Sequence, residues 1–334
     1  MNKKSVTMKD IALKAGVSVT TVSHVISKAR GVAQETRELV LRTLDELDYQ
    51  QSENRQNTGK PALDTLGVIT ANIQEDYYTL LVKTIETVAS KNGIPVLLCD
   101  SADDEEKETR NIGMMLNRKV DGLIIAPVGF VPYPRRLRAA NLPVVLVDRQ
   151  YDEHNTSFVG VNNADSAAKG TGYLVDKGCS RVGFIGYDET VYTMRQRVIG
   201  YKLGLMQRLP EQTPHILHLK YSKENSFNLI KAFLSEHHPD GLLCGTSDLC
   251  HQLISVVGDM GWRVPEELRI LTYDDNKWMD HLKYPVSVIT QPTVEIGHQA
   301  VERVIQLAGN RRPGKRTRTE ILFDTQLIDR LKNF

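Results

Sequence analysis

The chain has 334 residues and a formal net charge of +1, with 41% hydrophobic and 25% charged residues. This composition is typical of a soluble globular protein, and the length suffices for a small domain followed by two of ordinary size. No apolar run reaches the roughly 20 residues of a membrane span, and no signal peptide is recognisable, so we expect a cytoplasmic location. The four cysteines show no CxxC spacing, which argues against a disulfide framework or metal site, and no cofactor is expected.

Residues 7–47 predict three short helices, of which the first two form a helix-turn-helix. Gly16 breaks the first helix and permits the positive φ that the corner needs, and Ser18 is placed to cap the second helix. The third helix is expected at about 34–47. Apolar residues recur at helical spacing and would form a small core: Ile11, Ala12, Ala15, Val22, Val25, Ile26, Val40, Leu44 and Leu47.

The outer face of the second helix carries small and polar residues, which are able to approach base edges in a DNA major groove. These residues are Val19, Thr20, Ser23 and His24. Residues 1–30 hold six lysines and arginines against one aspartate, the charge expected where phosphates dock. Such charge alone also fits a solvated N-terminus. Its position on a helix-turn-helix is what indicates DNA binding.

These motifs resemble the headpiece of the lactose-repressor (LacI/GalR) family of bacterial transcription regulators. The matching runs are TMKDIA (7–12), AGVS (15–18), TVS (21–23) and TR (36–37), and the resemblance continues over essentially the whole chain. It implies that Val19, Thr20, Ser23 and His24 face the bases. It also implies that a further set lies nearer the phosphates: Thr7, Lys9, Ser18, Thr21 and Thr36. His24 replaces the arginine usual in the family, which predicts a different operator half-site at that base pair.

Residues 49–60 (YQQSENRQNTGK) contain no aliphatic side chain and predict a linker that stays disordered until something orders it. In the family, this position carries a hinge that inserts a leucine into the minor groove of the operator. Thr58 stands in the place of that leucine and has too little apolar surface to offset the unstacking of a base step. Arg55 is the alternative candidate, because arginine enters narrow A·T-rich minor grooves.

From Leu66 onward, short continuous apolar runs alternate with helical stretches, which indicates parallel strands covered by helices on both faces. The runs are 66–70, 94–99, 122–127, 143–148, 158–162, 181–186, 215–219, 241–245 and 269–274. Between the first two, residues 78–92 predict an amphipathic helix. The pattern restarts near residue 162, so we predict two Rossmann-like lobes, completed by a strand at 287–292, a helix at 295–308 and a strand at 320–323.

The predicted fold is therefore an all-α headpiece followed by an α/β core, and the resemblance implies a periplasmic-binding-protein-like core whose chain crosses between the lobes. The expected boundaries are: headpiece 1–48, linker 49–64, core 65–334, lobe 1 about 65–161 and 292–322, and lobe 2 about 162–291 and 323–334.

Two such lobes form a cleft at the carboxyl ends of their strands, where small ligands bind. Carboxylates, arginines and aromatic rings occur at those ends and suit a polyhydroxylated ligand. The candidates are Tyr77, Tyr78, Arg149, Arg195, Arg197, Tyr221 and Asp274. The resemblance implies effector contacts for Arg197 of R-x-x-G and for Asp274 after a strand, and it adds Gln291 to the same pocket.

Structural roles compete with these assignments. Asp274 fits a helix cap as well as a ligand contact, and the tyrosines fit packing at the rim as well as stacking on a ligand. Asp248 is expected to cap the following helix, and Trp278 to cover a lobe surface.

The arginines also suggest the charge of the effector. Three guanidiniums with only Asp274 and Asp275 as nearby acids favour an acidic effector, such as a sugar acid or sugar phosphate. The alternative is that Arg149 pairs on the surface with Asp152 or Glu153.

The sequence thus predicts a DNA-binding transcription regulator, in the simplest case a repressor, of a carbohydrate-utilisation operon. Its partners would be a double-stranded operator, a carbohydrate-like effector and, by resemblance, a second copy paired through the helix at 78–92. The alternative is a soluble carbohydrate-binding protein without operator-specific DNA binding. An enzyme is not expected, because neither lobe opens with the G-x-G-x-x-G of a dinucleotide site and no catalytic or metal cluster can be placed.

Overall fold

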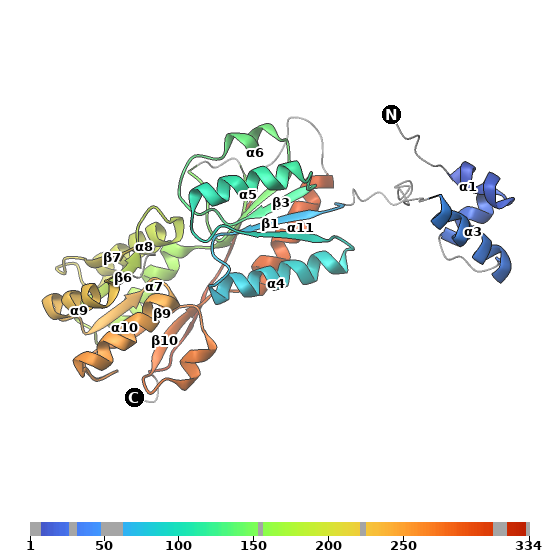
Figure 1. Cartoon of the computed structure of the whole chain (residues 1–334). Helices are drawn as coiled ribbons and strands as arrows, with labels where there is room; N and C mark the ends of the chain where they lie inside the picture. Colours follow the sequence, from blue (N-terminus) through green and yellow to red (C-terminus); the bar gives the residue numbers. More distant parts are fainter. Residues whose placement is uncertain are drawn as a thin grey trace. The chain divides into compact units, whose positions relative to one another are not determined.

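The structure is a computed structural model, and the chain divides into two compact units, Met1–Gly59 and Lys60–Phe334 (Figure 1). The described residues are 8–26, 32–47, 63–152, 156–220, 225–309 and 319–331. No helix within these ranges is both long and apolar enough to span a membrane.

The first unit contains three helices, α1 (Met8–Ala15), α2 (Val19–Ile26) and α3 (Gln34–Glu46). Gly16 adopts φ +65° at the corner between α1 and α2, a conformation that glycine reaches without a Cβ clash. The hydroxyl of Ser18 accepts a hydrogen bond from the backbone N–H of Thr21 (3.0 Å) and so caps α2. The predicted helix-turn-helix is confirmed.

A small apolar core holds these helices together. Its buried members are Ile11, Ala12, Ala15, Val22, Val25 and Val40, with Leu44 and Leu47 partly buried against them. These agree with the expected set, and the side chain of Ile26 lies outside the described residues. The core is small because each helix contributes only one narrow apolar stripe.

Lobe 1 is built on a parallel six-stranded sheet in the order β11-β5-β4-β3-β1-β2. Its strands are β1 (Leu66–Thr70), β2 (Val96–Asp100), β3 (Gly122–Ile125), β4 (Val144–Val147), β5 (Ser157–Val161) and β11 (Glu320–Phe323). Figure 1 shows α4 (Asp76–Lys91) and α11 (Thr293–Gly309) on one face, and α5 (Glu105–Asn117) and α6 (Arg135–Ala139) on the other. Separate apolar clusters fill the two interfaces.

Lobe 2 repeats this plan with the strand order β12-β10-β9-β8-β6-β7, except that the edge strand β12 pairs antiparallel with β10. Its strands are β6 (Val182–Tyr187), β7 (His215–Leu219), β8 (Gly241–Cys244), β9 (Arg269–Tyr273), β10 (Val286–Thr290) and β12 (Gln326–Ile328). The helices α7 (Asn163–Asp176) and α8 (Tyr192–Arg208) cover one face, and α9 (Ser226–His237) and α10 (Ser247–Met260) cover the other. A short 3-10 helix, η1 (Lys277–His281), follows β9.

The chain passes between the lobes three times. It leaves β5 for α7, leaves β10 for α11, which packs on lobe 1, and leaves β11 for β12. The expected two-lobed architecture is confirmed, and each of the nine predicted runs overlaps a strand. β12 was not predicted, because its three residues are all exposed and form no buried apolar run.

Candidate functional site

Ten side chains from the two lobes surround a narrow pocket in the core. They are Glu75, Tyr77, Asp148 and Arg149 from lobe 1, and Thr193, Met194, Arg197, Thr246, Asp274 and Gln291 from the lobe 2 side. The cavity between them measures about 20 Å³, whereas small-molecule sites occupy roughly 300–1,000 Å³. The lobes are therefore nearly closed on each other, and a ligand with several carbon atoms requires them to move apart.

A buried charge cluster forms the lobe 1 wall. Arg149 donates from Nη1 to Asp103 Oδ1 (2.9 Å) and to the carbonyl of Val128 (3.3 Å). Its Nε lies 3.7 Å from Asp148 Oδ2, which also accepts from the hydroxyl of Tyr78 (2.7 Å). Arg149 is only 3% exposed, so these carboxylates replace the water that the guanidinium would otherwise bind.

Two further groups on this wall derive from the start of α4. The hydroxyl of Tyr77 is buried and has no hydrogen-bond partner among the described residues. Burial, reinforced by Asp148 and Asp274, raises the pKa of Tyr77 well above its usual value, so it stays a hydrogen-bond donor. Burial also raises the pKa of Glu75 to about 8, although Arg149 acts in the opposite direction. Near pH 7 this carboxyl is therefore mainly protonated in the closed cleft.

Arg197 dominates the lobe 2 wall. Its Nε donates to Asn163 Oδ1 (2.8 Å), its Nη1 donates to the carbonyl of Gly245, and its Cζ lies 3.5 Å from the centre of the Tyr273 ring. A Cβ on Gly200, one turn along α8, would lie 2.0 Å from the carbonyl oxygen of Ala164 on α7. The glycine of R-x-x-G thus permits the close helix contact that brings Arg197 to Asn163.

Asp274 faces Arg197 from the end of β9. Its backbone has φ +65°, and its N–H donates to the carbonyl of Ile289 (3.0 Å). Gln291 donates from Nε2 to Asp274 Oδ1 (2.9 Å), while its Oε1 is buried without a partner among the described residues. Burial raises the pKa of Asp274, and Arg197 limits that rise.

Each buried arginine has hydrogen-bond partners in its own lobe. The partners of Arg149 given above all belong to lobe 1, and those of Arg197 all belong to lobe 2. Contacts between the lobes lie beside the pocket, where the N–H of Phe130 donates to the carbonyl of Thr190 (2.7 Å) and Gln150 Nε2 donates to the hydroxyl of Tyr192 (3.2 Å). The walls can therefore separate while Arg149 and Arg197 keep the hydrogen bonds that they make within their own lobes.

Five of the expected cleft residues meet at this pocket: Tyr77, Arg149, Arg197, Asp274 and Gln291. Tyr78 lies behind the wall, where it holds Asp148. Arg195 does not reach the pocket; it is exposed, with its Cζ 5.0 Å from the centre of the Phe130 ring. Tyr221 lies outside the described residues.

Five lining residues were missed by sequence reasoning: Glu75, Asp148, Thr193, Met194 and Thr246. Asp148 ends a predicted strand run, so its position was a usable signal. The other four precede or begin helices, and the sequence does not show which side of a helix start faces the opposite lobe.

The expected charge balance of the cleft is wrong. Asp275 points elsewhere and pairs with Arg330 (2.8 Å). Glu75 and Asp148 add carboxyl groups, so three carboxyl groups and two guanidiniums line the pocket. Arg149 pairs with Asp103, because the chain turns inward after β4, and Glu153 lies outside the described residues. The argument for an acidic effector loses its basis.

The structural roles expected for Asp248 and Trp278 have different outcomes. Thr246, not Asp248, caps α10, since its Oγ1 accepts from the N–H of Leu249 (3.3 Å). Asp248 instead accepts a hydrogen bond from the hydroxyl of Tyr187 (2.7 Å). Trp278 packs half-buried against an apolar cluster of lobe 2, as expected of a covering residue.

The helix-turn-helix presents the expected outer face. Val19 is 41% exposed, and Thr20, Ser23 and His24 are also exposed. Ser18 and Thr21 bond to each other at the start of α2 (2.8 Å between their hydroxyl oxygens). Among the remaining expected residues, Thr36 is partly buried, and Thr7, Arg55 and the side chain of Lys9 lie outside the described residues.

Comparison with known proteins agrees with both parts of this picture. Residues 7–52 match the family described as bacterial regulatory proteins, lacI family, and residues 171–330 match a periplasmic binding protein-like domain. The chain belongs to the lacI family of bacterial regulatory proteins. It is thus a DNA-binding transcription regulator, as its helix-turn-helix and two-lobed core indicate.

This lacI-family regulator resembles its relatives over nearly its whole length. It is 29% identical to the ribose operon repressor of Haemophilus influenzae, covering 96% of this chain and 97% of the relative. It is 27% identical to the transcriptional repressor PurR of Pasteurella multocida, covering 88% and 90%. A lac repressor dimer bound to operator and the anti-inducer ONPF shares the fold, with a TM-score of 0.76, 22% identity and 98% of each chain covered.

The raised pKa of Glu75 generates a prediction about the lacI-family core. Between pH 4.5 and about 8, the folded core holds a proton that the unfolded chain has released, so the free energy of unfolding falls as pH rises through this window. Glu75→Gln removes this contribution. The variant should gain stability relative to the wild type as pH rises to about 8, with no further gain above it.

Urea unfolding of the core at several pH values between 5 and 9 measures this difference. Asp76→Asn, at the exposed neighbouring residue, is the control and should run parallel to the wild type. Parallel curves for Glu75→Gln would show that Glu75 does not hold its proton in the closed cleft.

Proposed function

We propose that this regulator represses a carbohydrate-utilisation operon and responds to a neutral, hydroxyl-rich effector bound between its lobes. The observation that carries the proposal is the pocket itself, in which Arg197, Asp274 and Asp148 converge from two lobes in a chain that also carries a DNA-reading helix. Carboxylates accept hydrogen bonds from neighbouring hydroxyls, and a guanidinium donates two hydrogen bonds in a fixed geometry. The ribose operon relative supports a sugar as the effector class.

A neutral effector agrees with the charge of the walls. Three carboxyl groups surround the pocket, of which that of Glu75 is mainly protonated near pH 7, and the guanidinium of Arg149 already has Asp103 as its partner. An anionic ligand would therefore be repelled by the carboxylates of the pocket more than it would be attracted by guanidinium groups that have no carboxylate partner. This revises the expectation of a sugar acid or sugar phosphate that followed from the arginines alone.

The effector acts by changing the separation of the lobes. The pocket must widen beyond its 20 Å³ to admit a sugar. The start of the core is fixed to lobe 1, because the N–H groups of Asp64 and Thr65 donate to Asp121 Oδ2 (2.8 and 3.1 Å). In a dimer, a change in lobe angle therefore alters the spacing at which the two chains enter their headpieces. By reciprocity, operator DNA changes effector affinity by the same factor.

We infer a homodimer that pairs through lobe 1. Leu80 on α4 is 44% exposed and Leu98 on the edge strand β2 is 41% exposed, and α4 packs on β2. Exposed leucines on neighbouring elements suit a protein interface. A dimer also matches two headpieces to the half-sites of a pseudo-palindromic operator, and the lac repressor structure that shares this fold is a dimer.

On the operator, His24 is proposed to contact a base edge together with Val19 and Thr20. An imidazole does not form the two-pronged contact that arginine makes with guanine. His24→Arg should therefore change the base preferred at one position of each half-site. Selection of bound fragments from a random DNA pool measures this preference, and His298→Arg, at an exposed position on α11, is the control.

An unchanged consensus for His24→Arg would contradict the assignment of His24. Failure of the wild type to retard any fragment of its own upstream region at low salt would contradict the regulator itself.

The cleft is tested by replacing two adjacent aspartates, one inside the pocket and one outside it, with asparagine. A thermal-shift screen of neutral sugars, uronates and sugar phosphates should find stabilisation by a neutral sugar. Asp274→Asn should then lower affinity for that sugar about 10-fold or more, since hydrogen bonds to charged groups contribute about 1.5–3 kcal/mol. Asp275→Asn, whose carboxylate pairs with Arg330 outside the pocket, should leave affinity unchanged.

Calorimetry on the two variants provides the affinities. Equal losses in both variants, or tighter binding of an acidic sugar than of its neutral parent, would rule out the proposed pocket chemistry.

The dimer is tested by placing a charge on the lobe 1 surface. Leu80→Glu should give monomers and weaken operator binding, because the charge would be buried at the interface. Met206→Glu, at a 64% exposed position of α8 on lobe 2, is the control and should remain dimeric. Sedimentation velocity distinguishes the two states, and a dimeric Leu80→Glu protein would show that the chains pair elsewhere.

A further inference from the structure

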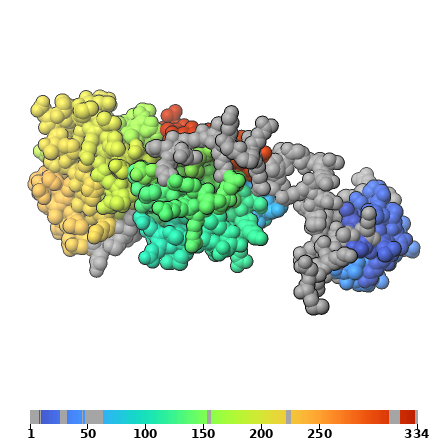
Figure 2. All heavy atoms as spheres, turned by 90° about the horizontal axis from the view of Figure 1, so that it is seen from above, coloured from blue at the N-terminus to red at the C-terminus, as the bar shows by residue number. Residues whose placement is uncertain are grey.

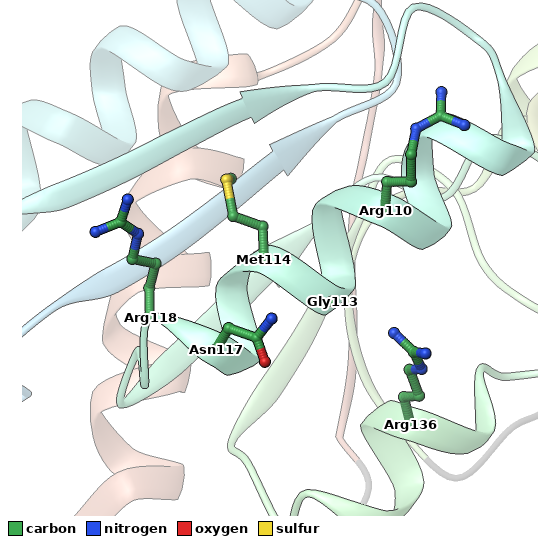
Figure 3. A pocket seen from close by; sticks show the side chains of 6 residues that line it. All are labelled: Arg110, Gly113, Met114, Asn117, Arg118 and Arg136. Carbon is green, nitrogen blue, oxygen red and sulfur yellow. The ribbon is translucent and has the colours of Figure 1, made fainter.

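A basic groove lies between α5 and α6 on lobe 1 and shares no lining residue with the interlobe pocket. Its lining is Arg110, Gly113, Met114, Asn117, Arg118 and Arg136, around a volume of about 630 Å³. Figure 3 shows Arg110, Met114 and Arg118 along α5 and Arg136 extending from α6 toward Gly113. In Figure 2 these helices (teal and green) lie at the molecular surface.

The groove carries three guanidiniums and no carboxylate in its lining. Arg110 has only a loose, exposed pair with Glu106 (3.6 Å), and such pairs contribute little. Among the described residues, neither Arg118 nor Arg136 has a carboxylate within 4 Å. Helix polarity accounts for Arg118, which caps the C-terminal end of α5. Arg136 also lies in the last turn of its helix, α6, but its guanidinium lies against Gly113 of α5.

The placement of Arg136 depends on a glycine in the middle of a helix. A Cβ at Gly113 would lie 2.9 Å from Arg136 Nη1, so the guanidinium rests on the bare backbone of α5. Glycine inside a helix is unfavourable relative to alanine. Here it makes room for the guanidinium, and the groove is shaped around this contact.

A second, more apolar pocket adjoins the groove at Arg136, which lines both. It measures about 290 Å³, and its lining combines Ile112, Val131, Pro132 and Pro134 with Glu105, Glu108, Thr109, Arg135 and Arg136. Ile112 is buried, and two prolines give the opposite side a stiff backbone. A cationic groove and an apolar pocket thus meet at one arginine.

We propose that this composite surface is a second ligand site, specific for a phosphate monoester with a small apolar body. The planar guanidinium matches phosphate oxygens with two parallel hydrogen bonds. Arg136 and Arg110 flank Gly113 and would receive the phosphate, while the apolar pocket takes the organic group. A volume near 290 Å³ suits one ring, which favours a small molecule over a protein segment.

The site contacts the segment that supports the interlobe cleft. Glu108 lines the apolar pocket, and its Oε2 accepts from the N–H of Val128 (2.7 Å). The carbonyl of Val128 accepts from Arg149, which lines the cleft. Glu108 and Arg149 thus bond to the same residue, Val128, so a ligand beside Glu108 is separated from the cleft residue Arg149 by Val128 alone.

Titration of the full chain with phenyl phosphate, inorganic phosphate and phenol at constant ionic strength tests the site, followed by phosphorus NMR and calorimetry. Phenyl phosphate should bind at least 10-fold more tightly than either fragment, because only it occupies both parts. Arg136→Gln should weaken it at least 10-fold. Gly113→Ala, which displaces the Arg136 guanidinium while favouring the helix, should weaken it severalfold without lowering the unfolding temperature.

Arg263→Gln, which removes the same charge from an exposed lobe 2 position, is the control and should bind as the wild type does. The proposal is overturned if phenyl phosphate fails to bind, or if Arg136→Gln and Gly113→Ala both bind it like the wild type. Equal weakening in Arg263→Gln would show general charge attraction and would also overturn it. So would equal affinity for phenyl phosphate and inorganic phosphate, since the apolar pocket would then contribute nothing.

Discussion

Two buried guanidiniums, one in each lobe, determine the character of the cleft on which the proposed response depends. Arg149 and Arg197 are each 3% exposed, and a buried charge without partners would cost several kcal/mol. Each arginine obtains its partners within its own lobe: Asp103 and Val128 for Arg149, and Asn163 and Gly245 for Arg197. The cleft walls are therefore ordered before any ligand arrives, and a ligand needs to supply only the contacts that bridge them.

The contacts that stabilise each lobe are different from the contacts that change when the lobes move. Apolar clusters on both faces of each sheet stabilise the lobes, while the contacts between the lobes include hydrogen bonds at Phe130 and Gln150 and the packing of the Tyr192 ring against Phe130 and Phe158. Two bodies with separate cores move relative to each other more readily than they deform. Three chain crossings join the lobes, and such motion does not require either sheet to unfold.

The headpiece differs from the lobes in the size of its apolar core. Its core contains six buried apolar side chains, three of them from α1, and such a small core leaves most of α2 free to face outward. Val19, Thr20, Ser23 and His24 are exposed for this reason. The three-helix headpiece has a small core, and for the same reason it presents a whole face of α2 to DNA.

Local pattern alone determined much of this protein. Continuous apolar runs marked the buried parallel strands, helical spacing marked the headpiece core, and the glycine and serine of the α1–α2 corner marked the turn, because all of these depend on residues close in sequence. Strand ends located four of the five expected residues that line the pocket, since parallel strands end at the same edge, and the family resemblance added Gln291.

Only the tertiary structure decided how the charges pair. Arg149 meets Asp103 from 46 positions away, Asp275 meets Arg330 from 55, and Arg195 turns to the Phe130 ring while Arg197, two residues later, enters the cleft. Charge partners are chosen by distance in space, and no local periodicity encodes that distance. For the same reason, the sequence suggested an acidic effector, whereas the folded chain places Asp103 and Asp148 beside Arg149, which removes the excess of positive charge on which that expectation rested.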